Sequence, residues 1–257
     1  MKNFAAMKKS GEKIAALTAY DSSFAKLAMQ AGADALLVGD SLGMVLQGRG
    51  DTLAVTMRQM IYHIQCAAAG APDAFIIGDM PFASYQQSPV QCYANAAKLL
   101  AAGASMVKVE GGAELADTVR FVCRRGIAVC AHIGLMPQRA RKEGGYKVHG
   151  KTEPEAAAVM EDAEALADAG AELMIVELLP RQLAAKVSAK VATPTIGIGS
   201  GPECDGQILV LHDMLGIGKP KKFVRDFMDG AGGILAAMQS YVAAVKSGDF
   251  PAAQHSF

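Results

Sequence analysis

The chain has 257 residues, 51% hydrophobic and 19% charged, which is enough apolar sequence for one large core. Lys plus Arg and Asp plus Glu both number 25, so bulk charge gives no reason to expect a nucleic acid or a membrane surface as a partner. The five cysteines form no C-x-x-C pair, and neither a signal-peptide pattern nor a long apolar run occurs, so we expect buried free thiols in a cytoplasmic protein.

Apolar runs with strand character alternate with helical periodicity along the chain. The expected strands are Ile14–Thr18, Ala35–Gly39, Ala74–Gly78, Met106–Val109, Ala128–Ala131, Leu173–Val176, Thr195–Ile198 and Ile208–Leu211. The expected helices are Ser23–Gln30, Thr56–Ala69, Val90–Ala101, Glu114–Arg124, Ala156–Ala169 and Arg181–Lys190, with one or two terminal helices over Lys222–Lys246. This alternation predicts an α/β fold, a single-domain (β/α)8 TIM barrel over residues 1–257 with an additional C-terminal helical segment.

A doubly wound open sheet is the competing architecture. It is disfavoured because the first expected strand is followed by Ala19-Tyr20-Asp21-Ser22 and not by G-x-G-x-x-G. Two long connections after strands, Ser41–Val55 and Gly134–Thr152, are expected to cover a substrate, as such loops do in barrel enzymes.

Four units of the chain read Ala-Gly-Ala, then a short apolar run, then an acid. The glycine is a helix-stop signal and the apolar run predicts a buried strand, so each acid falls at the carboxyl end of a strand. The acids are Asp40, Asp79, Glu110 and Glu177. The spacings from glycine to acid are 8, 9, 7 and 7 residues, so we expect some acids to point into the barrel and others to lie on its rim.

These acids predict a shared site, because barrel enzymes take their catalytic groups from the carboxyl ends of strands. Period-two alternation puts Lys108 and Glu110 on one strand face. His132 follows the next strand, and Glu177 lies in an apolar run where a carboxylate needs a partner. Converging carboxylates without a cysteine pair favour Mg²⁺ or Mn²⁺ over zinc.

A 2-oxo acid fits such a site, because its carboxylate and ketone oxygens can bind one metal ion together. The metal would stabilise the enolate that forms when a proton leaves the carbon beside the ketone. Lys108 would hold the substrate carboxylate or the enolate oxygen. A fourth carboxylate, away from the metal, would move the proton if burial raises its pKa.

Each residue also has a purely structural interpretation. A strand-end aspartate is commonly a helix N-cap or a turn former, and a lone histidine is commonly a hydrogen-bonded core residue. The Gly197–Gly201 run is either a tight turn or an anion site built from backbone N–H groups. Independent caps would not explain Lys108 and Glu110 on one face, which favours the shared site.

A set of longer motifs occurs in order along the chain. They are Leu17–Asp21, Leu37–Met44, Gly78–Phe82 with Ser84-Tyr85, Val107–Gly112, Ala131–Leu135 with Pro137-Gln138, Gly144–Val148, Gly150–Thr152, Ile196–Gly201, Cys204–Gln207, His212–Gly216 and Gly248–Pro251. Together they cover nearly the whole chain, which resembles the ketopantoate hydroxymethyltransferase family. The chain departs from that family at Ser200, where Ala is more usual, and at Leu178-Leu179, where Cys-Val is more usual.

The resemblance implies an enzyme that transfers a hydroxymethyl group from 5,10-methylenetetrahydrofolate to 3-methyl-2-oxobutanoate and so forms 2-dehydropantoate (ketopantoate). This is the first step of the pantoate branch of pantothenate biosynthesis. It also implies Mg²⁺, with Mn²⁺ or Co²⁺ as alternatives, and a homo-oligomer, expected to be a decamer. No aromatic-rich segment of the sequence marks where the folate docks.

The resemblance also assigns site residues by position. Asp40 and Asp79 correspond to metal ligands, and Glu110 to a third acid at or near the metal. Contacts to the oxo acid are implied for Asp40, Ser41, Asp79 and Lys108, with His132 near the substrate. Glu177 corresponds to the general base, which takes the proton from the branched carbon.

Two other functions remain open at this point. A Mg²⁺-dependent carbon–carbon lyase or phosphonomutase of the isocitrate-lyase-like barrels would also use strand-end acids, but those enzymes usually carry a catalytic cysteine in a mobile loop. Ser41–Val55 and Gly134–Thr152 contain no cysteine. A non-catalytic barrel that senses a small oxo acid is the other alternative, and the presence of Lys108, Glu110 and Glu177 together argues against it.

Overall fold

The computed structural model describes residues 2–257 and contains a closed barrel of eight parallel strands, ordered β1 to β8. They are β1 (Ile14–Thr18), β2 (Ala35–Val38), β3 (Ile76–Asp79), β4 (Met106–Glu110), β5 (Val129–Gly134), β6 (Leu173–Glu177), β7 (Thr195–Ile198) and β8 (Gly206–Leu209). The pairing of β1 with β8 closes the sheet, which confirms the (β/α)8 barrel and excludes the open sheet. The last strand begins at Gly206, two residues before the predicted Ile208.

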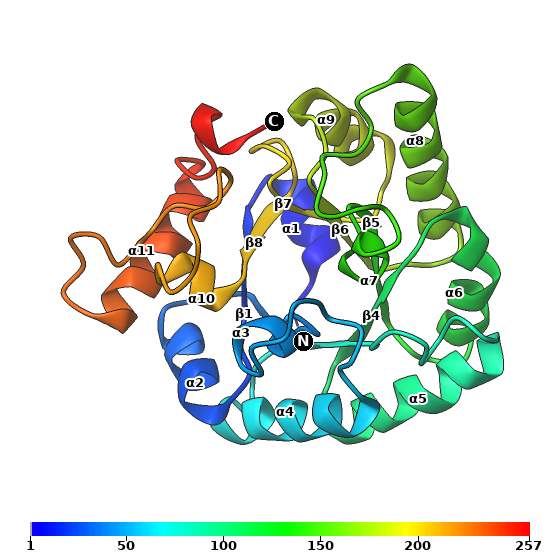
Figure 1. Ribbon diagram of the computed structural model, residues 1–257, viewed down its shortest axis with the longest axis horizontal. Coiled ribbons are helices and arrows are strands. Elements are labelled where there is room, and N and C mark those ends of the chain that lie inside the picture. Colours follow the sequence, from blue (N-terminus) through cyan, green and yellow to red (C-terminus); the bar gives the residue numbers. More distant parts are fainter. Residues whose placement is uncertain (1) are drawn as a thin grey trace.

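Most helices form an outer ring around the strands (Figure 1). The helices are α1 (Phe4–Ser10), α2 (Ser22–Gln30), α3 (Leu42–Val45), α4 (Met57–Gly70), α5 (Pro89–Ala101), α6 (Ala116–Cys123), α7 (Pro137–Ala140), α8 (Glu153–Asp168), α9 (Arg181–Lys190), α10 (Leu211–Met214) and α11 (Ile234–Ser247), with 3₁₀ turns at η1 (Ala113–Leu115) and η2 (Ala253–His255). In the view of Figure 1, α1, α3 and α7 lie inside the ring. Within residues 2–257, no helix has both the length and the apolar character needed to cross a bilayer.

The repeated Ala-Gly-Ala units end helices in two ways. Gly32, Gly103 and Gly170 have φ values of +90°, +118° and +106°, the left-handed conformation that glycine adopts most easily at a helix end. Gly70 instead remains inside α4, where a Cβ would lie 2.0 Å from the Ser22 carbonyl oxygen. This second unit therefore needs glycine for the close packing of α4 against α2.

The carboxyl-terminal segment differs from the prediction. Only α11 is helical, whereas residues 222–233 form turns, so the prediction of helix from Lys222 onward is wrong. Gly230 and Gly233 lie in this stretch with φ values of +73° and +148°, which a continuous helix cannot contain. Helix α11 packs on the barrel closure, where the Tyr241 hydroxyl donates to backbone carbonyls of β1 and β8.

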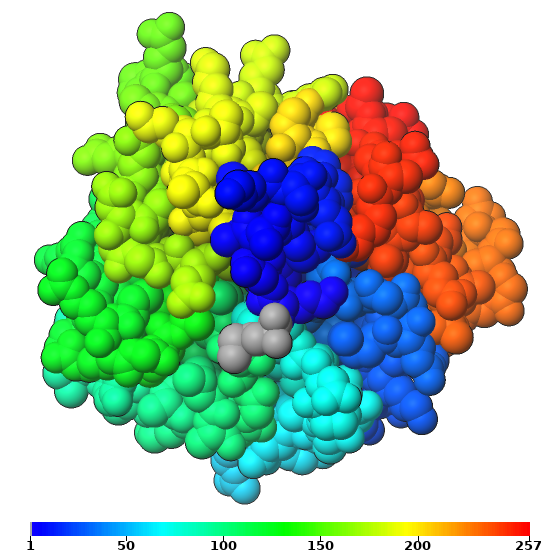
Figure 2. Space-filling model, turned by 180° about the vertical axis from the view of Figure 1, so that it is seen from behind, coloured from blue at the N-terminus to red at the C-terminus, as the bar shows by residue number. Residues whose placement is uncertain are grey.

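Helix α1 covers the amino-terminal end of the barrel, as the dark-blue segment at the centre of Figure 2 shows. The ammonium group of Lys8 anchors it, donating to the Ser188 carbonyl at 2.7 Å and to the Asp205 carboxylate at 2.8 Å.

The five cysteines are all free, but Cys66 and Cys123 are partly exposed, so the prediction of buried thiols holds only for the other three.

Candidate active site

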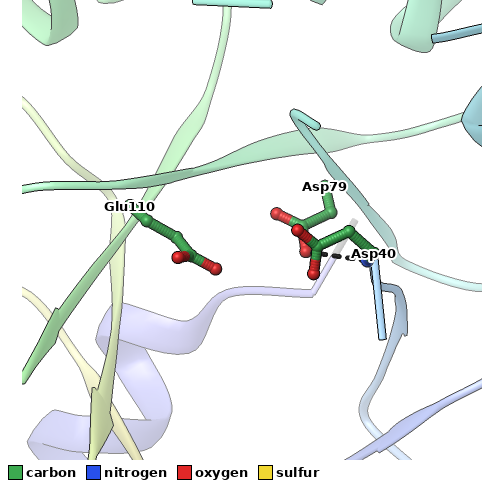
Figure 3. Close-up of side chains that lie close together, drawn as sticks. All are labelled: Asp40, Asp79 and Glu110. Carbon is green, nitrogen blue, oxygen red and sulfur yellow. Dashed lines mark hydrogen bonds between the residues drawn. The ribbon is translucent and has the colours of Figure 1, made fainter. Parts of the chain in front are cut away.

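Three acids meet at the carboxyl end of the barrel. Asp40 is the second residue after β2, and Asp79 and Glu110 are the last residues of β3 and β4. One carboxylate oxygen from each lies within 4.8 Å of the others, and Figure 3 shows the three side chains turned toward one another. All three are buried, because the acids lie between strands that are covered on their outer face by helices.

Lys108 lies among these acids. Its Nζ atom is 2.7 Å from Asp79 Oδ1 and 2.9 Å from Glu110 Oε1, so the predicted common face of Lys108 and Glu110 is confirmed. Asp79 Oδ2 accepts a hydrogen bond from the backbone N–H of Asp40 at 3.0 Å. Lys108 thus pairs with two of the three acids, and in the described chain no basic side chain forms an ion pair with Asp40.

The acids titrate differently because of this uneven pairing. Burial, together with the charges of Asp79 and Glu110, raises the pKa of Asp40 well above its usual range. Burial acts in the same direction on Glu110, but Lys108 and His132 outweigh it and lower the pKa of that carboxyl to about 2. For Lys108, the surrounding carboxylates outweigh burial and raise the pKa well above that of a free lysine.

The donor set fits a hard divalent cation. Oxygen donors at close range, with no thiolate in the cluster, suit Mg²⁺ or Mn²⁺. Asp40 is a buried carboxylate without a cation, and burying a charge without a partner is costly. A bound divalent cation would remove that cost, so both the oxygen donors and the unpaired charge of Asp40 fit a metal site.

His132 connects the acid cluster to Glu177. Its Nδ1 atom lies 3.6 Å from Glu110 Oε1, and its Nε2 atom lies 3.2 Å from Glu177 Oε2. Neither contact has hydrogen-bond geometry, so both are ionic contacts of a ring whose nitrogens are buried without a hydrogen-bond partner. Burial and Lys108 lower the pKa of His132, but Glu110 and Glu177 outweigh them and raise it to about 9.

Glu177 ends β6 outside the acid cluster. Leu178, the next residue, has φ +48°, a conformation that non-glycine residues adopt rarely and that is often found at functional sites. The main chain therefore turns sharply where Glu177 enters the cavity.

All seven predicted site residues line one cavity of about 470 Å³. They are Asp40, Ser41, Asp79, Lys108, Glu110, His132 and Glu177. The two long connections cover its mouth as predicted, and they touch where the Tyr146 hydroxyl meets Met44 Sδ at 3.2 Å. Ser41 is fixed by its hydroxyl, which lies 2.9 Å from the Tyr20 hydroxyl.

The structural interpretations of these residues fare differently. Neither Asp40 nor Asp79 caps a helix with its side chain, and His132 is not a hydrogen-bonded core histidine. Gly197 and Ile198 end β7, and the chain bends at the next two residues. Ser200 is fully buried there, and its hydroxyl donates to the Val176 carbonyl at 2.9 Å.

Several residues at the site had no predicted role. Tyr85 and Gln138 lie behind the acids, and Tyr146, Phe223 and Phe257 line the mouth of the cavity. The position of Gln138 could have been predicted from the sequence, because it is a polar residue in the first turn after a strand end. The residues at the mouth could not have been predicted, since they come from distant parts of the chain.

Comparison with known proteins gives a consistent result. The model of the family described as ketopantoate hydroxymethyltransferase matches residues 1–253. The chain is 55% identical to a 3-methyl-2-oxobutanoate hydroxymethyltransferase of Paraburkholderia phymatum, over 98% of this chain and 93% of the relative. It is 57% identical to the enzyme of that name from Neisseria meningitidis serogroup A, over 98% of this chain and 96% of the relative.

Solved structures with the same fold are more distant in sequence. A phosphonopyruvate hydrolase superposes with a TM-score of 0.64 at 16% identity, covering 84% of both chains. A 2,3-dimethylmalate lyase superposes with a TM-score of 0.59 at 19% identity, covering 84% of this chain and 83% of the other. At these identities the likeness shows the barrel fold alone. The near full-length match in sequence shows that the chain belongs to the ketopantoate hydroxymethyltransferase family and is a transferase.

Proposed function

We propose that the cavity transfers a hydroxymethyl group from 5,10-methylenetetrahydrofolate to 3-methyl-2-oxobutanoate, giving 2-dehydropantoate in the first step of the pantoate branch of pantothenate biosynthesis. The observation that carries this proposal is the separation of two kinds of carboxylate in one cavity. Asp40, Asp79 and Glu110 converge, while Glu177 stands apart beyond His132. The convergent acids suit a cation, and the separate acid suits proton transfer.

The substrate would bind over the three acids. They would hold Mg²⁺, with Mn²⁺ or Co²⁺ as alternatives, which when bound would polarise the ketone oxygen of the oxo acid. Lys108 supplies a fixed positive charge beside this position, because its neighbours keep it protonated. Ser41 faces the same cavity and would donate its hydroxyl hydrogen to the substrate carboxylate.

Glu177 would take the proton from the branched carbon of the substrate. The electron pair left behind forms the enolate. Water would break both carbon–nitrogen bonds of the folate methylene bridge, which leaves its two hydrogens on the folate nitrogens and frees the one-carbon unit as formaldehyde. The enolate carbon would then bond to that carbon, and the resulting alkoxide would take the proton back from Glu177. The two carboxylate neighbours of His132 raise its pKa, so the ring is protonated near neutral pH and would orient Glu177. A 3.2 Å contact from the Nε2 atom keeps this carboxylate directed into the cavity.

The folate would dock at the mouth of the cavity. Tyr146 and Phe257 are 48% and 38% exposed there, although both are apolar enough to favour burial. Their rings would stack on the flat pterin. Lys222 lies over the Phe257 ring, 4.5 Å from its centroid, and would attract the carboxylates of the folate glutamate.

One assay tests the proposed function. Purified protein is incubated with 3-methyl-2-oxobutanoate and 5,10-methylenetetrahydrofolate, and 2-dehydropantoate is followed by mass spectrometry with and without EDTA. We expect product that EDTA abolishes and that Mg²⁺ in excess restores. Cleavage of the oxo acid without folate would instead indicate a lyase, and tight binding without turnover would indicate a sensor.

Three wider properties complete the proposal. Residues 1–257 would act as one catalytic domain in the cytoplasm, with small molecules as its only ligands. The chain would assemble as a homodecamer, which the exposed apolar side chains Tyr62 and Val90 on the neighbouring helices α4 and α5 support. Sedimentation velocity measures the assembly directly, and a monomer at micromolar concentration would contradict it.

A further inference from the structure

Gln138 contacts more of the acid cluster than any predicted site residue except Lys108. It lies in the first turn of α7, is 4% exposed and carries no charge. Its side-chain Nε2 donates to Asp40 Oδ2 at 2.9 Å, and its backbone N–H donates to Glu110 Oε2 at 3.0 Å. One residue thus holds two acids that come from different strands.

The backbone carbonyl of Met80 fixes which way the Gln138 amide faces. That carbonyl can only accept, and it lies 2.9 Å from Gln138 Nε2. The amide nitrogen must therefore face both Met80 and Asp40, and the amide oxygen must face the other side. Asp40 consequently meets a hydrogen-bond donor in every allowed arrangement of this side chain.

Tyr85 and Gln86 support the other side of the amide. The Tyr85 hydroxyl donates to Gln138 Oε1 at 2.7 Å, and Gln86 Nε2 donates to the same oxygen at 3.2 Å. Tyr85 is fully buried, and its hydroxyl is also 3.0 Å from the backbone nitrogen of Glu110. The glutamine is therefore held from both sides, and its rotamer cannot change without breaking buried hydrogen bonds.

We propose that Gln138 is a positioning residue that orients Asp40 and Glu110 for the divalent cation, and that Tyr85 holds Gln138 in place. Gln138 occupies one acceptor site of Asp40 Oδ2 and so fixes the plane of the carboxylate that faces the other acids. This rests on the proposed function, which places a cation at the three acids.

The expected effect is on affinity for the cation. Outer residues that orient metal ligands change metal affinity by about 10–100-fold when they are removed. Gln138→Met keeps the length of the side chain and the backbone N–H bond to Glu110, but removes all four hydrogen bonds of the side-chain amide. It should therefore weaken the binding of Mn²⁺ by about tenfold or more, through Asp40 alone.

Gln207→Met is the matched control. Gln207 is also buried, at 3% exposure, but its amide donates to the Gly201 carbonyl and does not contact the acids. Mn²⁺ alone is titrated into each variant without substrate, and the free ion is measured by electron paramagnetic resonance. Melting temperatures of the metal-free proteins report the structural cost, which should be larger for Gln138→Met, because it loses four amide hydrogen bonds and Gln207→Met loses one.

A tenfold loss of Mn²⁺ affinity in Gln138→Met, with normal affinity in Gln207→Met, supports the proposal. Equal affinities in Gln138→Met and the wild type overturn it, and so does an equal loss in the control. Should Gln138→Met not fold, Tyr85→Phe takes its place, and an unchanged affinity there overturns the role of Tyr85. If the wild-type protein binds no Mn²⁺, the metal site of the proposed function is contradicted, and the positioning role of Gln138 is contradicted as well.

Discussion

The two ends of the barrel both bury acids next to lysines, but they balance charge differently. At the amino-terminal end, Asp34 precedes β2 and accepts hydrogen bonds from Lys2, Lys246 and the backbone N–H of Ala15. Asp205 precedes β8 and is paired with Lys8. Lys246 also pairs with Glu12, so three acids there have three lysines, and each carboxylate is satisfied by the protein itself.

At the carboxyl-terminal end, Lys108 pairs with Asp79 and Glu110, and no basic side chain of the described residues pairs with Asp40. The excess of negative charge is unfavourable for a metal-free fold, because the interior does not solvate it. The two ends therefore differ in function as well as in charge. Acids that are paired with lysines stabilise the barrel, and acids in excess of their basic partners are available to bind a ligand. This agrees with the general division between the two faces of (β/α)8 barrels.

Asp40→Asn tests this division most strongly. We expect turnover to fall to the limit of detection, because a cation ligand is lost. The metal-free protein should nevertheless melt at an equal or higher temperature, since burial and the neighbouring acids already raise the pKa of Asp40. Activity assays and calorimetry in EDTA measure both effects, and a lower melting temperature would contradict the comparison.

Glu177→Gln should have the next largest effect on activity. Loss of a general base lowers rates by about 10²–10⁴-fold. Exchange of the C3 proton of 3-methyl-2-oxobutanoate in D2O, followed by nuclear magnetic resonance without folate, isolates the proton step. Mn²⁺ binding should remain intact, because Glu177 lies outside the three-acid cluster. Exchange at the wild-type rate would rule out Glu177 as the base.

Asp34→Asn should cost stability and leave activity unchanged. Lys2 and Lys246 outweigh burial and lower the pKa of Asp34 below its usual value, so its stabilising effect is present at neutral pH and is lost as the pH falls through the folded-state pKa. We expect a loss of about 1–3 kcal/mol at pH 7. Urea unfolding at several pH values should show that the difference in unfolding free energy between the wild type and Asp34→Asn becomes smaller in acid. A difference that is constant with pH would refute the stabilising role of the Asp34 charge.

Ser200→Ala should give the smallest change. The Ser200 hydroxyl donates to the Val176 carbonyl and accepts from the Leu179 N–H, so its removal should cost about 1 kcal/mol. For a chain of this length that corresponds to a melting shift of about 2–4 °C. KM for both substrates should not change, although Ser200 lies near the active end. A changed KM would show that this turn also takes part in binding.

Much of the fold was predictable because it follows from local patterns. Apolar runs predicted every strand, and the largest differences are at strand ends: β3 and β8 begin two residues away from the predicted start, and β5 ends three residues later than predicted. Helix periodicity failed after Lys222, because apolar residues in that stretch pack on the barrel while Gly230 and Gly233 end any helix. The short helices α3 and α7 were not predicted, since one turn of helix leaves almost no periodic signal.

The sequence alone determined the order of strands and helices and placed an acid at the end of four strands, because strand ends and side-chain alternation are local properties. Only the tertiary structure decided which acids meet. It left Asp40 without a cation, put His132 between Glu110 and Glu177, and brought Gln138 behind the cluster. These contacts depend on barrel closure, which joins segments far apart in the chain at distances that no local pattern encodes.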